Sequence, residues 1–392
     1  MNKQTLKKQK LALIVGGLIA STSTVYAETD FGKFSADFRL RYEGVDQANA
    51  KKNADALTLR TLLNFKTKDY NGFSGMIEVE DSRALIDDYN DTLGNNPDYS
   101  VVADPETTEL DQLYVQYVQD GFKAKLGRQV IVMDNHRFVG HVGWRQDKQT
   151  FDAFSFGAGQ DKWKFDYSYI NQRNRIFADE KDIESNDHLV NASYKTEFGK
   201  FTGYGYLLEV DNAINNALDT WGIRYAGGFE SVLLQAEFAQ QDYENDTTEY
   251  SAEYMMLEAG YKFSKVTAKI GFEILGTDSG EYGFQTPLAT LHKFNGWSDQ
   301  FLSTPDVGLQ DFYASVAGKV WGGKWLMAYH DFKADETHAE FDNYGSELNA
   351  QYTRKLTSYL SGGIKYANYS AGDEGTGKVD TDKLWLWLQA KF

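Results

Sequence analysis

Arginine and aspartate side chains are interspersed through residues 127–153, and they are the best candidates for binding chemistry. The arginines are Arg128, Arg137 and Arg145, and the aspartates are Asp134, Asp147 and Asp152. Guanidinium groups form paired hydrogen bonds with carboxylates, so this segment can clamp the acidic groups of a ligand. In the alternative interpretation, the arginines pair with the nearby aspartates and only pin the segment in place.

Histidines are the other candidates, for catalysis or metal binding. The chain has six, namely His136, His141, His188, His292, His330 and His338. Two of them have acidic neighbours, so a catalytic His–Asp pair is one interpretation. Each histidine nevertheless lies in or beside a polar loop, no serine has an activated setting, and the acidic cluster at 87–91 lacks the glycine and distal glutamate of an EF-hand. The sequence therefore predicts no enzyme, no metal site and no cofactor.

The elements that must position these residues are most clearly marked at the C-terminus. In residues 382–392, side chains two apart share a face. One face consists of Leu384, Leu386, Leu388, Ala390 and Phe392, and the other of Trp385, Trp387, Gln389 and Lys391. A chain that stops on phenylalanine within an apolar stripe resembles the last strand of bacterial outer-membrane barrels, which pairs with the first strand and closes the sheet. Phe392 is then the expected contact for the barrel-assembly machinery. If Trp385 and Trp387 face inward, they either stack on sugar rings or contact an aromatic girdle or plug.

The first residues indicate export from the cytoplasm. Four lysines precede a short apolar run at 11–20, and Val25-Tyr26-Ala27 offers a small residue for cleavage, a pattern typical of a secretory signal peptide at residues 1–27. No stretch approaches the roughly 20 apolar residues of a spanning helix, so a membrane location requires a barrel. The alternative is a soluble, secreted all-β protein. The chain has no cysteine and therefore no disulfide framework.

Apolar and polar residues alternate in segment after segment. Residues 33–43, 57–66 and 73–80 each have one apolar face, predicted to contact lipid, and one polar face, predicted to line a lumen. The inward charged residues of these segments include Arg39, Arg41, Arg60, Glu78 and Glu80. Residues 150–159 and 324–332 alternate poorly, and their facing stays open.

Long and short connections alternate along the chain. Long polar connections, such as 83–108, 131–148 and 277–307, alternate with short turns such as Asn71-Gly72 and Asp120-Gly121. Long extracellular loops and short periplasmic turns produce this arrangement. The sequence thus predicts an all-β fold, a transmembrane antiparallel β-barrel of about 18 strands, with sixteen as the alternative, in a single domain at 28–392.

The overall charge indicates which kinds of partner the protein can bind. The formal net charge is −17, and residues 1–27 contain four lysines and no acid, so the mature chain carries −21. Such acidity argues against nucleic acid as a partner, because phosphates would be repelled. It suits loops that face outer-membrane lipid and lipopolysaccharide, where divalent cations can bridge anionic groups.

Two long segments carry a resemblance to a known family. Residues 127–154 and 284–297 are similar to segments of the alginate-export family of outer-membrane β-barrels. The resemblance implies an eighteen-stranded barrel in the bacterial outer membrane, with an arginine-containing lumen that passes an anionic polysaccharide or small-anion cargo and with long loops across the pore. Carried onto this sequence, the cationic lining comprises Arg39, Arg41, Arg60, Arg224, Arg128, Arg137 and Arg145. A general porin for small solutes or oligosaccharides, or a barrel that displays loops as an adhesin, are the alternatives.

Two features modify this expectation. The acids Glu78, Glu80, Glu237, Glu258 and Glu273 fall on predicted lumen positions beside the cations. Opposed acids and bases set a transverse field that orients charged solutes, which suits sugars and small anions as well as polymers. Arg128 shares its parity with Phe122, Ala124 and Leu126, which places it on the lipid side unless it lies at the rim or after a bulge at Gly127.

Overall fold

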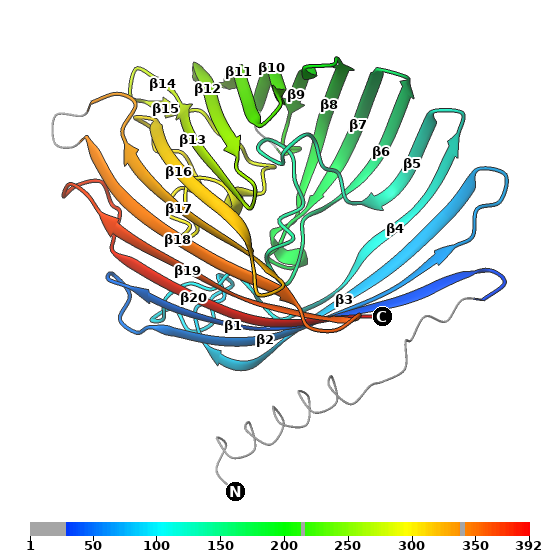
Figure 1. Cartoon of the computed structure of the whole chain (residues 1–392), viewed down its shortest axis with the longest axis horizontal. Coiled ribbons are helices and arrows are strands. Elements are labelled where there is room, and N and C mark those ends of the chain that lie inside the picture. Colours follow the sequence, from blue (N-terminus) through cyan, green and yellow to red (C-terminus); the bar gives the residue numbers. More distant parts are fainter. Residues whose placement is uncertain (1–28, 213–215, 338–341) are drawn as a thin grey trace, which may run out of the picture.

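The strands close into a single barrel with irregular segments folded inside it (Figure 1). The computed structural model describes residues 29–212, 216–337 and 342–392, so the signal peptide predicted at 1–27 lies outside the described residues. Eighteen strands form the barrel sheet, and β14 (Thr277–Asp278) and β15 (Tyr282–Gly283) form a small separate hairpin. The prediction of eighteen strands is confirmed.

Each barrel strand pairs antiparallel with the next barrel strand along the chain. The strands are β1 (Gly32–Gln47), β2 (Ala54–Thr67), β3 (Phe73–Asp88), β4 (Thr107–Gln119), β5 (Phe122–Gln129), β6 (Thr150–Gln160), β7 (Trp163–Asn174), β8 (Ile183–Lys195), β9 (Gly199–Leu208), β10 (Asn216–Phe229), β11 (Val232–Asn245), β12 (Glu249–Lys262), β13 (Val266–Leu275), β16 (Leu309–Val320), β17 (Gly323–Lys333), β18 (Asn343–Lys355), β19 (Leu360–Ala371) and β20 (Thr381–Lys391). Short 3-10 turns lie at Asp179–Lys181 (η1) and Leu291–Lys293 (η2).

The last strand closes the barrel against the first. β1 and β20 are paired from Asp37↔Lys391 to Gln47↔Thr381. Phe392 extends this pairing, because its N–H donates to the Ala36 carbonyl (2.9 Å) and its carbonyl accepts from the Ala36 N–H (3.0 Å). Closure satisfies the backbone groups that an open edge would leave exposed, which a bilayer does not tolerate. Among the described residues, no helix is long and apolar enough to span a bilayer.

Two segments that alternated poorly in sequence keep a regular two-residue facing in the barrel. The β6–β7 register shifts between Asp152 and Ala153, and the β17–β18 register shifts between Phe332 and Lys333, but the extra residue lies on the partner strand in each case, β7 and β18. A bulge changes the facing of the strand that carries it, so β6 and β17 are not affected. Their polarity alternates poorly because inward positions are apolar, and Phe151, Ala153 and Phe332 are buried in the interior cluster.

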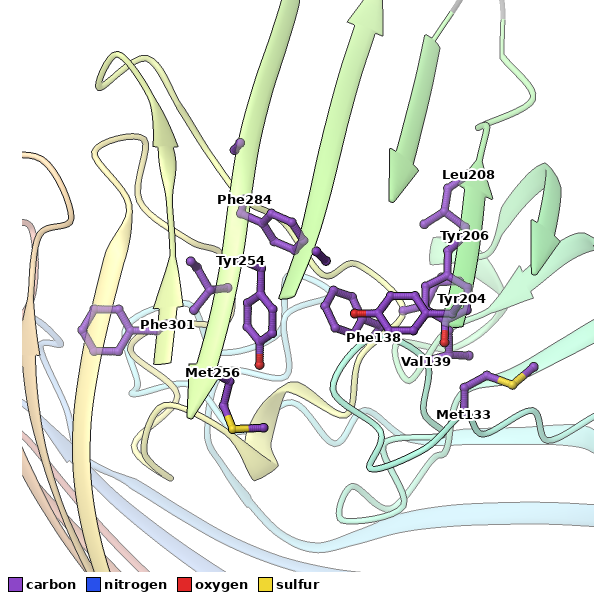
Figure 2. Packing of buried hydrophobic residues seen from close by; sticks show 14 of the residues in the cluster. Met133, Phe138, Val139, Tyr204, Tyr206, Leu208, Tyr254, Met256, Phe284 and Phe301 are labelled. Carbon is purple, nitrogen blue, oxygen red and sulfur yellow. The ribbon is translucent and has the colours of Figure 1, made fainter. Parts of the chain in front are cut away.

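Two long connections fold into the lumen (Figure 1). The plug segment, residues 130–149, joins β5 to β6, and the inner loop, residues 276–308, joins β13 to β16. Figure 2 shows where they meet the wall: Phe138 of the plug segment points toward Tyr204 and Tyr206 of β9, with Tyr254 of β12 nearby. Phe284 and Phe301 of the inner loop belong to the same buried cluster. At this level the lumen is therefore filled by loops that pack on the strands.

Candidate functional site: charged contacts across the lumen

A row of arginines lies on the inner face of β1 and β2. Arg39 and Arg60 are directly opposite each other, and Arg41 lies one inward position further along β1. All three are at most 7% exposed. Like charges opposite each other destabilise a sheet unless other groups compensate. Arg60 has such a group, because its Nη2 lies 3.2 Å from Asp37.

The plug segment docks on this row through its backbone. Arg39 donates to the carbonyls of Gly143 (3.1 Å) and Arg145, and to the side chain of Gln146 (2.9 Å). Arg41 donates to the Trp144 carbonyl and to the carboxylate of Asp104, a residue of the loop between β3 and β4. Charge-assisted hydrogen bonds are stronger than neutral ones, so the arginine row fixes the position of the plug segment.

Arg145 connects three parts of the chain. Its Nη1 lies 3.0 Å from Glu43 of β1, its Nη2 lies 3.0 Å from Asp299 of the inner loop, and Asp104 lies 4.0 Å away. Burial alone would lower the pKa of the guanidinium, but the charges of Glu43 and Asp299 outweigh it and raise the pKa above its ordinary value. Arg145 thus stays charged and joins the plug segment, the wall and the inner loop.

Arg137 makes the equivalent connection at the opposite wall. Its Nε lies 2.8 Å from Glu273 of β13, and its Nη2 donates to Asn295 of the inner loop at 3.1 Å. The carboxylate of Glu273 also accepts from the hydroxyl of Tyr254 at 2.6 Å. Of the two interpretations offered by the sequence, these contacts match pinning, but the acids come from other elements and not from the neighbouring aspartates.

Lys148, at the end of the plug segment, lies among acids on the wall. Its ammonium is 2.8 Å from Glu78 and also contacts Asp111, and Glu80 is 4.0 Å away. Neither carboxylate oxygen of Glu80 has a hydrogen-bond partner in the part of the chain that the structure describes, and the same holds for Oδ2 of Asp147. Burial raises the pKa of Asp147 well above its ordinary value, and the charge of Glu80 adds to this effect.

An aromatic cluster holds the ammonium of Lys365. This lysine of β19 lies 3.9 Å from the ring centre of Trp297 and 4.3 Å from that of Trp144, distances typical of cation–π contacts. Its Nζ is 2.6 Å from Nε2 of His292, whose Nδ1 is 2.6 Å from Asp299. Burial lowers the pKa of His292 to about 3, so the imidazole is neutral, accepts from Lys365 and donates to Asp299.

Trp385 and Trp387 of β20 face this cluster. The ring of Trp144 lies 5.8 Å from Trp385 and 5.5 Å from Trp387, in edge-to-face geometry in both cases. The two tryptophans therefore contact the plug segment, one of the roles considered for them.

Arg128 requires a correction. It does not face the lumen: it is paired with Leu113 and Asp152 across the neighbouring strands, on the face that carries exposed Leu113, Leu126 and Phe154. Its Nε and Nη2 donate to Asp152 at 2.7 and 3.1 Å. Gly127 has a φ of +116°, but the pairing of β5 with both neighbours continues without a shift. Strand alternation gave the right face, and the position carried over from the family was wrong.

The remaining candidates lie elsewhere on the inner wall. Arg224 of β10 pairs with Glu237 of β11 at 2.6 Å. Asp134 of the plug segment accepts from Lys200 at 2.6 Å and from Asn191 at 2.9 Å. These contacts hold the start of the plug segment against β8 and β9, apart from the arginine row.

The histidines do not form a shared centre. His330 contacts Asp311 at 2.9 Å, His188 contacts the hydroxyl of Tyr167 at 2.9 Å, and the rings of His136 and His141 lie 5.3 Å apart. His338 lies outside the described residues. Within the described ranges, no group of three or more histidine or acidic side chains is arranged to hold a metal ion.

The sequence-based candidates omitted Glu43, Asp104, Lys148, Asp299 and Lys365. Strand parity was a usable signal for Glu43 and Lys365, which fall on inward positions of β1 and β19. The other three lie in loops, where alternation carries no information about facing.

A closed antiparallel barrel with an apolar outer face, a charged inner face and loops folded into the lumen defines an outer-membrane porin of bacteria. Residues 31–286, well over half of the chain, match the family model described as "Alginate export". The chain belongs to the alginate export family. No curated protein matches it.

Solved structures share the fold at low sequence identity. OccK9 (OpdG) of Pseudomonas aeruginosa is 12% identical with a TM-score of 0.71, and the match covers 93% of this chain and 98% of that chain. OccAB4 of Acinetobacter baumannii is 12% identical with a TM-score of 0.69, and the match covers 94% of this chain and 100% of that chain. At such identity, the likeness concerns the fold alone.

Proposed function

We propose that the protein is a passive diffusion channel for a hydrophilic anionic solute, such as an acidic saccharide. The supporting observation is a basic strip along the inner face of β1 and β2. From the outer side toward the periplasm it contains Arg41, the opposed pair Arg39 and Arg60, Asp37 paired with Arg60, and the opposed pair Lys33 and Lys66, so its net charge is positive. A cavity of about 520 Å³ adjoins its lower end, and Ser35, Asn64, Asp37 and Glu78 are among its lining residues.

The strip has two roles, one in holding the plug segment and one in attracting anions. Its upper arginines hold the plug segment, while Arg60 pairs with Asp37 of the same wall. A wall of fixed positive charge raises the local concentration of anions and lowers that of cations. Alternation of hydroxyl, amide and cationic groups along the same wall also suits the hydroxyl and carboxylate groups of acidic sugars.

The test is ion selectivity of the purified channel in a planar bilayer under a KCl gradient. The wild-type protein is expected to conduct and to show a reversal potential that indicates anion preference. Arg60→Ala should shift the reversal potential toward cation preference, and the combined change of Arg39, Arg41 and Arg60 to alanine should shift it further. Arg128→Ala is the matched control, because it removes an arginine from the outer face and should leave the reversal potential unchanged.

Two results would contradict the proposal. Equal reversal potentials for wild type and the triple variant would reject the arginine row as the source of selectivity. A barrel with no conductance even after replacement of the inner loop by a short turn would instead indicate a display role for the loops.

A further inference from the structure

A second basic region lies at the periplasmic end of the lumen, away from the arginine row. It is a cavity of about 780 Å³ between the turn joining β12 to β13 and the turn joining β16 to β17. Four lysines line it, namely Lys262, Lys265, Lys319 and Lys324, and no acidic residue does. Ser264, Thr267, Gln351 and Thr353 add hydroxyl and amide groups to the same lining.

Two of these lysines lie close enough for their charges to repel each other. Lys319 and Lys324 are direct cross-strand neighbours on β16 and β17. Like charges in this position repel each other. None of the four lysines forms an ion pair with an acidic residue in the part of the chain that the structure describes.

The absence of acids extends over the whole sector of the barrel. Residues 259–272, 312–330 and 348–372 contain no aspartate or glutamate, whereas they contain Lys262, Lys265, Lys269, Lys319, Lys324, Arg354, Lys355 and Lys365. In a chain with a net charge of −17, a sector of this kind is a marked local exception. The nearest lumen acid on β12, Glu258, is already paired with Lys269 at 2.8 Å.

Strand parity directs three of the four lysines into the lumen. Lys262 lies on the face of β12 that carries Tyr254 and Glu258, and Lys319 lies on the face of β16 that carries Asp311 and Tyr313, whose partners are inside the barrel. Lys324 shares the face of its opposite residue Lys319. A ligand would therefore approach from the periplasmic opening of the lumen and not from the lipid.

We propose that this cavity is a binding site for multivalent oxyanions at the periplasmic mouth, where lysine ammonium groups hold phosphate or carboxylate groups and the hydroxyl and amide groups supply further hydrogen bonds. Ammonium groups bind such anions as flexible point charges, so the site accepts several oxyanions and does not require one shape. The site differs from the arginine row because its cations are not occupied by other parts of the chain. The inference deepens the proposed function, but binding at the cavity does not itself require conduction.

The test uses inorganic tripolyphosphate as the probe and calorimetry of the intact, refolded barrel in a neutral detergent. Wild type is expected to bind tripolyphosphate, and the variant with Lys262, Lys319 and Lys324 all changed to glutamine is expected to bind at least about tenfold more weakly, which corresponds to about 1.4 kcal/mol. The matched control changes Lys123, Lys162 and Lys195 to glutamine. These are three other periplasmic-side lysines that line neither this cavity nor the basic strip, so the control removes the same charge and should retain most of the affinity.

Equal loss in the two triple variants would overturn the proposal, because it would mean that tripolyphosphate responds only to total charge. No binding by the folded wild-type barrel would overturn it as well. Folding of each variant is checked by heat-modified migration on gels, and the single change Lys319→Gln serves if the triple variant does not fold. Because calorimetry does not depend on ion flow, a barrel that binds the probe but does not conduct would contradict the proposed function and leave this inference standing.

A second experiment, in planar bilayers, distinguishes a soluble oxyanion from a lipid headgroup as the ligand of the cavity. In neutral phosphatidylcholine bilayers, tripolyphosphate added on the periplasmic side is expected to reduce the current, whereas addition on the extracellular side is expected to have a weaker effect. If about 20% phosphatidylglycerol in the bilayer, an anionic content that creates a negative surface potential, abolishes the block, lipid headgroups occupy the cavity and the proposal of a soluble ligand is wrong.

Discussion

Arg145 carries a buried charge at the point where the wall, the plug segment and the inner loop meet. Removal of one partner from a buried ion pair leaves the other charges without compensation, at a cost of about 3–5 kcal/mol. Arg145→Ala should therefore loosen the plug segment, because Glu43 would keep only Arg41, at 3.5 Å, and Asp299 would keep only Lys383 and His292. Limited proteolysis is the measurement, with faster cleavage within 130–149 as the expected result.

The control for this change is Lys51→Ala. Lys51 pairs with Asp98 at 2.7 Å, but both side chains are at least half exposed. Exposed ion pairs contribute little to stability. Unchanged protection of the plug segment in the Arg145 variant, or equal loss in both variants, would contradict the structural role given to Arg145.

Asp147 gives a prediction with a defined pH dependence. Since its pKa is raised in the folded protein, its ionised form is the one that destabilises docking of the plug segment. Docking should strengthen as pH falls from neutral toward the ordinary value of 3.8. Asp147→Asn should stabilise the docked plug at neutral pH, because the amide has the size of the carboxyl group but carries no charge to be buried or repelled by Glu80; a pKa difference of one to two units corresponds to about 1–3 kcal/mol.

The measurement is thermal unfolding of wild type and Asp147→Asn in detergent across this pH range. The difference between the two proteins should shrink as the solution becomes more acidic, because the wild-type carboxyl group then becomes neutral as well. A difference that stays constant, or grows, on acidification would show that ionisation of Asp147 does not oppose docking.

At the scale of elements, the plug segment also depends on apolar packing. Phe138 is 8% exposed, and its ring centre lies 5.2 Å from that of Tyr254 and 5.3 Å from that of Tyr204. Truncation of a buried phenylalanine costs about 3–5 kcal/mol. Phe138→Ala should raise the mean single-channel conductance, because a weakly held plug segment opens more of the lumen. Val132→Ala, at a position that is 37% exposed, is the control and should leave the conductance close to that of wild type.

The strands could be predicted from the sequence because a two-residue period needs only local information. This period gave the facing of Arg39, Arg41 and Arg60, and it also gave the outward facing of Arg128 that the family comparison had obscured. The contacts of Arg137 could not be predicted, since Glu273 lies 136 residues away along the chain. Irregular loops have no period that fixes direction, so their partners are set only by packing in the closed barrel.

Asp104 shows the same limit for the loop between β3 and β4. Nothing in its neighbourhood distinguishes it from the other acids of that loop, yet it contacts Arg41 and accepts from the Gln146 N–H at 2.8 Å. A charged side chain can leave water only where several donors meet it. Those donors come from β1 and the plug segment, two elements whose proximity exists only after folding.

At the scale of the whole molecule, Phe392 contributes to the contact between the last strand and the first. Phe392 is 7% exposed, its ring is stacked on Tyr359 with 5.4 Å between centres, and its backbone forms two hydrogen bonds with Ala36. Net contributions of about 1 kcal/mol per hydrogen bond make this end a modest part of the total stability. Its loss from a complete barrel, in which β1 and β20 pair from Asp37↔Lys391 to Gln47↔Thr381, should accordingly be tolerated better than its loss during assembly, before this pairing has formed.

Deletion of Phe392 separates these two situations. After refolding in detergent micelles, the shortened protein should still show the gel migration of a folded barrel, with slightly lower thermal stability. In cells, where we propose that the barrel-assembly machinery contacts Phe392, the amount of folded protein in the outer membrane should fall several-fold. Phe34→Ala removes another aromatic ring from the same end of the barrel, 49% exposed on the outer face, and should reduce the amount much less. Equal reduction by both changes would mean that lost apolar contact with lipid, and not recognition of the chain end, limits assembly.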